Sequence, residues 1–117
     1  MKMEKLIFET MDSYNQYVQN LIIASDQIAE GLRNENVQNA LHLILQFSEG
    51  LNWLVDVNKK LTELGYPQEL LVEQIHEYLH EINAGLEIQD FIVVADMFEY
   101  EIKPFFENVE LYEVTSN

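Results

Sequence analysis

The apolar residues in the first third of the chain are spaced by alternating intervals of four and three residues. Because an α-helix has about 3.6 residues per turn, this spacing places them along one helix face. The sequence therefore predicts a long helix with a buried stripe in which Ser25 is a small polar residue. The stripe consists of Ile7, Met11, Tyr14, Val18, Leu21, Ser25, Ile28 and Leu32.

The ends of this first helix are predicted from shorter signals. Ser13 and Gln16 have the spacing of a capping box, which predicts a start near Ser13 and not near Met3. Gly31 and Asn34 are residue types that commonly end a helix, so we expect the helix to end close to them.

A second helix is predicted over about residues 35–64, where apolar residues form two neighbouring stripes. Two stripes give a wide apolar face, which predicts contact with at least two other helices. A kink is expected within Ser48-Glu49-Gly50, because a mid-helix glycine costs roughly 1 kcal/mol relative to alanine. The stripes are Ala40, Leu43, Phe47, Gly50, Leu54, Val57, Leu61 and Leu64, and beside them Val37, Leu41, Ile44, Leu51 and Val55.

Two further helices are predicted in the second half. Gly65-Tyr66-Pro67 suits the end of one helix and the first position of the next, so the third helix is expected to begin at Pro67. The fourth is expected to begin near Asp90, a good N-cap residue. The residues expected to face inward are Leu71, Ile75, Tyr78, Leu79, Ile82 and Leu86 on the third helix, and Phe91, Val94, Ala95, Phe98 and Ile102 on the fourth.

These patterns predict the fold class. We expect a single all-α domain over residues 1–117, folded as an antiparallel four-helix bundle with short connections. Pro104 lacks a backbone N–H and clashes with the preceding turn, so the last helix is expected to be kinked or interrupted there.

The charge of the chain restricts its partners. The sequence has 21 acidic and 6 basic residues, a formal net charge of −15. Residues 67–117 contain 12 acids and one base, Lys103, so this part alone carries −11. Such a field repels nucleic-acid phosphates and anionic membranes, and it favours a basic protein partner. We expect no binding to nucleic acid or membrane.

The location is predicted from what the sequence lacks. There is no cysteine, and hence no disulfide framework. The N-terminal residues do not resemble a signal peptide, and no apolar run reaches the roughly 18–20 residues that span a bilayer. These observations predict a cytoplasmic protein.

Four glutamates, Glu69, Glu73, Glu77 and Glu81, are spaced four residues apart with no basic residue among them. On a helix they would form a row of like charges, and each neighbouring pair would repel by roughly 0.2–0.5 kcal/mol. We interpret the row as a solvated face or as a surface that meets a basic partner. The candidate partner-binding residues are Glu69, Glu73, Glu77, Glu81, Trp53, Asp96 and Glu99.

His76-Glu77-Tyr78-Leu79-His80 matches the H-E-x-x-H pattern, in which two histidines hold zinc and the glutamate acts as a general base. Glu99 follows at a spacing that suits a third ligand. On a helical wheel, however, both histidines lie well away from the apolar face, so they point toward water. We therefore expect neither catalysis nor a metal or other cofactor, and keep His76, His80 and Glu99 as an alternative zinc site.

Two short stretches, Gly50-Leu51-Asn52-Trp53-Leu54 and the segment from Asp90 to Pro104, resemble small uncharacterised acidic helical proteins of Gram-positive bacteria. The resemblance implies a helical bundle and no known activity. The small, acidic, all-helical build is also similar in kind to export and flagellar chaperones.

The function expected from the sequence is protein–protein interaction without catalysis. The chain would act as a chaperone-like or regulatory module, whose acidic C-terminal half binds a basic partner segment, with helix-in-groove binding as the expected mode. A homodimer is a further possibility. The alternatives are a zinc-dependent hydrolase that uses the HEYLH motif and an acidic nucleic-acid mimic that occupies the site of a DNA-binding protein.

Overall fold

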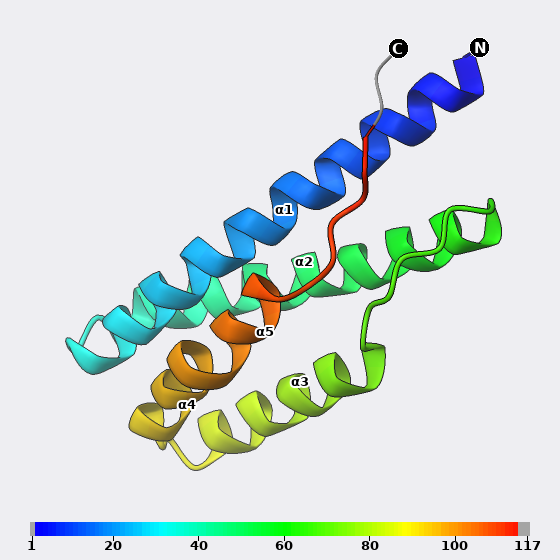
Figure 1. The fold of residues 1–117 in the computed structure, drawn as a ribbon. Coiled ribbons are helices and arrows are strands. Elements are labelled where there is room, and N and C mark those ends of the chain that lie inside the picture. Colours follow the sequence, from blue (N-terminus) through cyan, green and yellow to red (C-terminus); the bar gives the residue numbers. More distant parts are fainter. Residues whose placement is uncertain (1, 115–117) are drawn as a thin grey trace.

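The structure, a computed structural model, describes residues 2–114 and confirms that the chain is helical. Within this part there is no strand, and the elements form an elongated body of 50 × 23 × 20 Å (Figure 1). In chain order they are α1 (Lys2–Arg33), α2 (Val37–Glu63), α3 (Val72–Glu87), α4 (Phe91–Met97), one π-helical segment η1 (Phe98–Ile102) and α5 (Lys103–Glu107).

The predicted stripe of α1 is the centre of the core. All eight of its residues are buried, and the Ser25 hydroxyl donates a hydrogen bond to the Leu21 carbonyl at 2.8 Å. The predicted start near Ser13 is wrong, because α1 already begins at Lys2. Ile7 and Met11 are buried upstream of Ser13, so packing of this face stabilises the first turns despite the capping signal.

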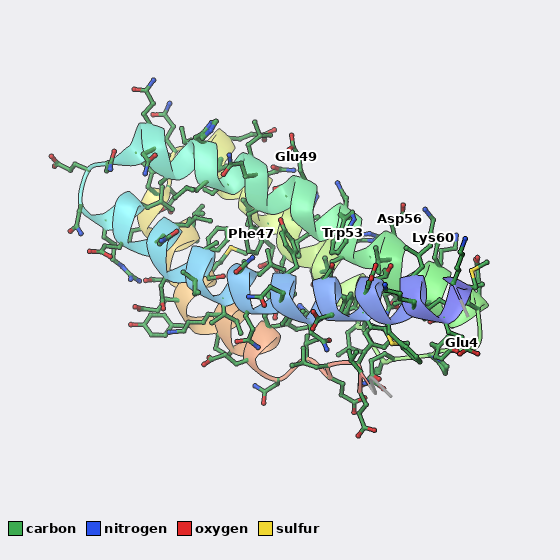
Figure 2. All side chains as sticks on the ribbon, turned by 90° about the horizontal axis from the view of Figure 1, so that it is seen from above. Glu4, Phe47, Glu49, Trp53, Asp56 and Lys60 are labelled. Atoms are coloured by element: carbon green, nitrogen blue, oxygen red, sulfur yellow. The ribbon has the colours of Figure 1, made fainter. Side chains whose placement is uncertain are left out.

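Gly50 does not interrupt α2, which is continuous from Val37 to Glu63, so the kink expected there does not break the helix. Gly50 instead permits close packing of α1 and α2, since a Cβ atom at this position would overlap the Tyr17 hydroxyl. The Tyr17 ring also meets Trp53 edge-on, with 5.4 Å between ring centroids. Figure 2 shows Trp53 beside α1.

The chain between α2 and α3 is extended, and we call residues 66–71 the linker segment. The prediction that the third helix begins at Pro67 is therefore wrong. Tertiary contacts hold this segment: the Asn58 amide donates to the Gln68 carbonyl at 2.9 Å, and the Tyr66 ring packs on Phe8. Leu71, expected to face inward, is 57% exposed.

The last helical stretch begins as predicted, because the Asp90 carboxylate accepts a hydrogen bond from the Val93 N–H at 3.3 Å. Directly before Pro104, the backbone widens into the π-helical segment η1, in which the Lys103 N–H reaches the Phe98 carbonyl. Proline cannot donate a hydrogen bond to a carbonyl of the preceding turn. A wider turn here is consistent with that missing donor.

After α5 the chain forms an extended C-terminal arm, residues 109–114, that runs back alongside α1 toward the N-terminal end (Figure 1). Tyr112 is its buried anchor, and its ring packs edge-on against Tyr14 with centroids 4.8 Å apart. Within the described residues, no helix is both long and apolar enough to cross a membrane.

Gly50→Ala is expected to destabilise the protein. The methyl group displaces Tyr17, and overpacking of this kind costs about 1–3 kcal/mol, which exceeds the gain of roughly 1 kcal/mol in helix propensity. Urea denaturation would measure the free energy of unfolding, and Trp53 fluorescence would report the displaced ring. Asn52→Ala, at an exposed position of α2, serves as the control. A more stable variant with unchanged fluorescence would contradict the packing role of Gly50.

Candidate functional site

The four glutamates of the predicted row do not lie on one helix. Glu73, Glu77 and Glu81 are exposed on α3, but Glu69 belongs to the linker segment before that helix. The row was inferred from a helix start at Pro67, which tertiary contacts of the linker segment prevent. Three glutamates therefore form a ridge on α3, and Glu69 is free to take part in a different surface.

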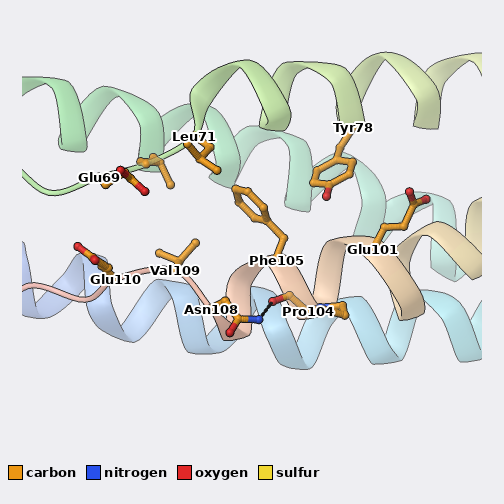
Figure 3. A pocket seen from close by; sticks show the side chains of 10 residues that line it. Glu69, Leu71, Tyr78, Glu101, Pro104, Phe105, Asn108, Val109 and Glu110 are labelled. Carbon is orange, nitrogen blue, oxygen red and sulfur yellow. Dashed lines mark hydrogen bonds between the residues drawn. The ribbon is translucent and has the colours of Figure 1, made fainter.

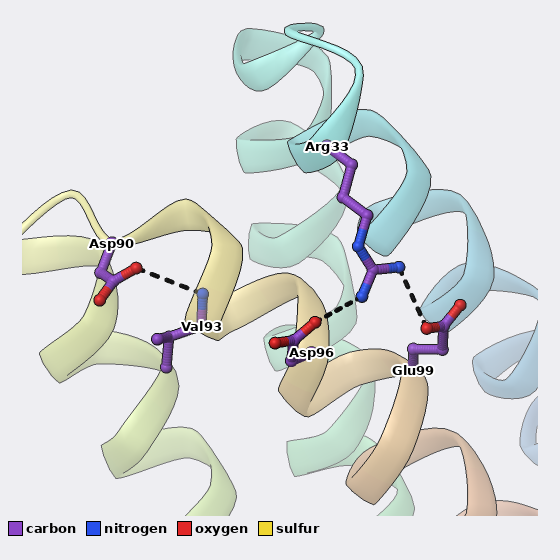
Figure 4. Close-up of polar contacts among 5 residues, drawn as sticks. All are labelled: Arg33, Asp90, Val93, Asp96 and Glu99. Atoms are coloured by element: carbon purple, nitrogen blue, oxygen red, sulfur yellow. Dashed lines mark hydrogen bonds and ion pairs between the residues drawn. The ribbon is translucent and has the colours of Figure 1, made fainter.

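Asp96 and Glu99 are engaged within the fold. The Arg33 guanidinium donates to the Asp96 carboxylate at 2.6 Å and pairs with Glu99 at 3.2 Å (Figure 4). It also lies 5.9 Å from the centroid of the Tyr100 ring. These contacts join the end of α1 to α4 and η1. Both carboxylates thus have an internal partner.

Trp53 lies on a different part of the molecule from the α3 ridge. Its side chain is 41% exposed and packs on Tyr17 of α1, whereas α3 packs against α4 and α2. The structure therefore does not gather the predicted partner-binding residues into one surface.

The alternative zinc site is not assembled. His76 and His80 are exposed on α3, and Glu99 pairs with Arg33. In the part of the chain that the structure describes, no three histidine, aspartate or glutamate side chains lie close enough together to hold a metal ion.

A groove opens where α3, α5, the linker segment and the C-terminal arm meet (Figure 3). It encloses about 350 Å³ and is open to solvent. Of the predicted site residues it includes only Glu69. Its lining residues are Glu69, Leu70, Leu71, Tyr78, Glu101, Pro104, Phe105, Asn108, Val109 and Glu110.

The floor of the groove is aromatic and braced by the core. Tyr78 of α3 meets Phe105 of α5 edge-on at 5.6 Å, and Phe105 meets Phe106 at 5.0 Å. Phe106 in turn packs on the buried Phe47 of α2. A chain of ring contacts thus leads from the solvent-facing groove into the core, which holds the floor in one arrangement.

The rim of the groove is acidic. Glu69, Glu101 and Glu110 are exposed there, and the described lining residues include no lysine, arginine or histidine. Burial raises the pKa of Tyr78 above its ordinary value, and the charges of Glu101, Glu81 and Glu77 raise it further. The negative charges of α3 and η1 therefore act together at the Tyr78 hydroxyl.

A buried polar cluster fixes the two extended walls of the groove. The Asn58 amide nitrogen donates to the Gln68 carbonyl at 2.9 Å and to the Tyr112 hydroxyl oxygen at 3.2 Å. One side chain of α2 thus contacts both the linker segment and the arm. The walls are also joined directly, because the Gln68 amide donates to the Glu110 carboxylate at 2.5 Å.

Asn15 holds the arm from the other side. Its amide nitrogen donates to the Tyr112 carbonyl at 2.8 Å, and its oxygen accepts from the Tyr112 N–H at 2.9 Å. Together these bonds resemble the pair of hydrogen bonds that one strand offers its neighbour. Sequence reasoning missed this cluster because asparagines carry no periodic signal, and only the position of the arm gives Asn15 and Asn58 their roles.

Tyr14→Phe and Tyr112→Phe are expected to have opposite effects. The Tyr14 hydroxyl is buried and has no hydrogen-bond partner among the described residues, whereas that of Tyr112 accepts from Asn58. Removing the first should leave the free energy of unfolding unchanged or raise it by up to about 1 kcal/mol. Removing the second should lower it by about 0.5–1.5 kcal/mol. Equal losses in both variants would contradict this description.

The buried Tyr14 hydroxyl also predicts how the free energy of unfolding changes at alkaline pH. Burial and the neighbouring Tyr112 raise the pKa of Tyr14, so above about pH 10 the unfolded chain releases this proton while the folded chain retains it. The stability contributed by Tyr14 is thus fully present below pH 10 and lost as pH rises above it. Between about pH 10 and 11, Tyr14→Phe should lose less stability than the parent protein in urea titrations.

Comparison with known proteins gives a family but no activity. A search of curated proteins and a search of solved structures each find no match to this chain. One family model, described as a domain of unknown function, matches residues 9–111. The matched range includes most of α1, all the other helices, the linker segment and every residue that lines the groove. The chain belongs to the family of the domain of unknown function DUF8042.

Proposed function

We propose that this protein is a non-catalytic protein-interaction module that holds a basic segment of a partner in the acidic groove. The observation that carries the proposal is the composition of the groove: three exposed carboxylates surround an aromatic and aliphatic floor, with no cationic side chain among its lining residues. A partner that brings both cations and an apolar side chain would match this combination.

The apolar part of the groove would supply affinity. Leu71 is more than half exposed at one edge, and Tyr78, Phe105 and Val109 are only half-buried. Covering such surface gains roughly 25 cal/mol per Å² of apolar area removed from water. Because the aromatic floor is braced by the core, little conformational freedom is lost when a partner binds.

The charges would supply orientation and speed of encounter. The ridge of Glu73, Glu77 and Glu81 lies on the same helix as Tyr78 and extends the negative field along α3. Complementary charge steers association and disfavours acidic partners, and each charge pair at an exposed rim adds up to about 1 kcal/mol of affinity. The rim would therefore select the class of partner, and the floor would retain it.

The scaffold proposed for this role is an antiparallel four-helix bundle whose last helix is kinked or interrupted at Pro104. A chaperone-like or regulatory role in the cytoplasm of a bacterium fits such a scaffold, because a small rigid body can cover and release a basic segment of a larger protein.

The proposal predicts salt-sensitive binding that depends on the rim. A partner captured from native lysate at about 50 mM salt, identified and then purified, should bind more weakly at 500 mM salt because exposed charges are screened. In Glu69→Gln/Glu101→Gln its Kd should rise about tenfold, equivalent to about 1.4 kcal/mol. Isothermal titration calorimetry would measure both effects.

The matched control is Glu30→Gln/Glu49→Gln, which changes the net charge equally at two exposed positions outside the groove. It should leave Kd within about twofold of the parent value. If both double variants weaken binding equally, the partner responds to total charge and the groove is not its site.

A further inference from the structure

One edge of the C-terminal arm is paired and the other is open. Asn15 of α1 makes hydrogen bonds with both main-chain groups of Tyr112. In extended chain, successive residues direct their N–H and C=O groups to opposite edges. Leu111 and Glu113 therefore direct these groups away from Asn15, and within the described residues none of them makes a hydrogen bond to the protein.

The open edge continues the wall that the arm gives to the groove. In Figure 3 the arm lies between α1 and the space beneath α3, and Val109 and Glu110, the two residues before Leu111, border that space. Leu111 and Glu113 are themselves exposed residues. An exposed strand edge of this kind is a template on which another extended chain can pair.

The open edge favours an extended occupant over a helical one. A helix uses its main-chain N–H and C=O groups internally, so it has none to offer Leu111 and Glu113. The groove encloses about 350 Å³. It can accept a few side chains of an extended segment, in which alternate residues point to the same side.

We infer that the occupant is an extended segment with alternating cationic and apolar residues, which adds to the open edge of the arm through main-chain hydrogen bonds to Leu111 and Glu113. Its apolar side chains would lie on Phe105 and Val109, and its cations would meet Glu69, Glu101 and Glu110 (Figure 3). This inference rests on the proposed function and replaces helix-in-groove binding with strand addition.

The test uses the full-length protein labelled with ¹⁵N and a heptapeptide in which lysine and valine alternate. Two further peptides carry N-methyl groups on alternate residues, so that each blocks the hydrogen bonds of one peptide edge. The parent peptide should shift the amide signals of Leu111 and Glu113 and slow their hydrogen exchange. One methylated peptide should bind at least about tenfold more weakly than the parent, while the other retains most of the affinity.

Two results would overturn the inference, and they differ in what they say of the proposed function. If both methylated peptides bind like the parent and the shifts remain around the groove, main-chain pairing is absent but the groove still binds basic segments. If no peptide shifts the groove signals, or shifts spread over all acidic faces, the inference and the proposed function both fail. A peptide with glutamate in place of lysine controls for charge and should not bind.

Discussion

The buried stripe of α1 is the surface on which the rest of the structure depends. The helix α1 contacts α2, α4, η1 and α5, so four of the other five elements pack directly against it. Its large side chains, among them Tyr14, Val18 and Ile28, are fully buried. Only α3 lacks an extensive contact with α1, and it is joined to the core through α4, α2 and the aromatic contact of Tyr78 with Phe105. This partial separation of α3 leaves the space in which the groove forms.

A groove bordered by extended chain needs a fixed arrangement of its walls, and the asparagines provide it. Extended segments at a helical surface lack the internal hydrogen bonds of a helix, so their buried polar groups must find other partners. Asn58 satisfies the Gln68 carbonyl and contacts the Tyr112 hydroxyl, and Asn15 satisfies both main-chain groups of Tyr112. Each bond contributes only about 0.5–1.5 kcal/mol, but together they position two segments that have no helical structure.

The sequence predicted the helical parts of the fold well and their ends less well. The α1 stripe and the Asp90 cap were correct because both are local patterns: spacing along one face, and one side chain bonding a nearby N–H. The starts of α1 and α3 were wrong because burial of Ile7 and Met11, and the contacts of Gln68 and Tyr66, lie outside any local window. The groove was not predicted, since Glu69, Glu101 and Glu110 come together only through the paths of the linker segment and the arm around the helices.

The placement of the few cations explains why the rim of the groove stays negative. Arg33 pairs with Asp96 and Glu99, Lys103 pairs with Asp26 of α1, and Lys60 pairs with Asp56 on the same helix. The first two pairings join α1 to the last helical stretch, where they add to the packing of the core.

The carboxylates at the groove have no cationic partner among its lining residues, and all three side chains are exposed to water. Water screens their mutual repulsion, which keeps its cost to stability small. A cation that enters the groove displaces part of that water, so the attraction it experiences from the three carboxylates grows as the apolar floor is covered. Charge and apolar burial are therefore coupled in this groove, and a ligand that has only one of the two properties gains less than one that has both.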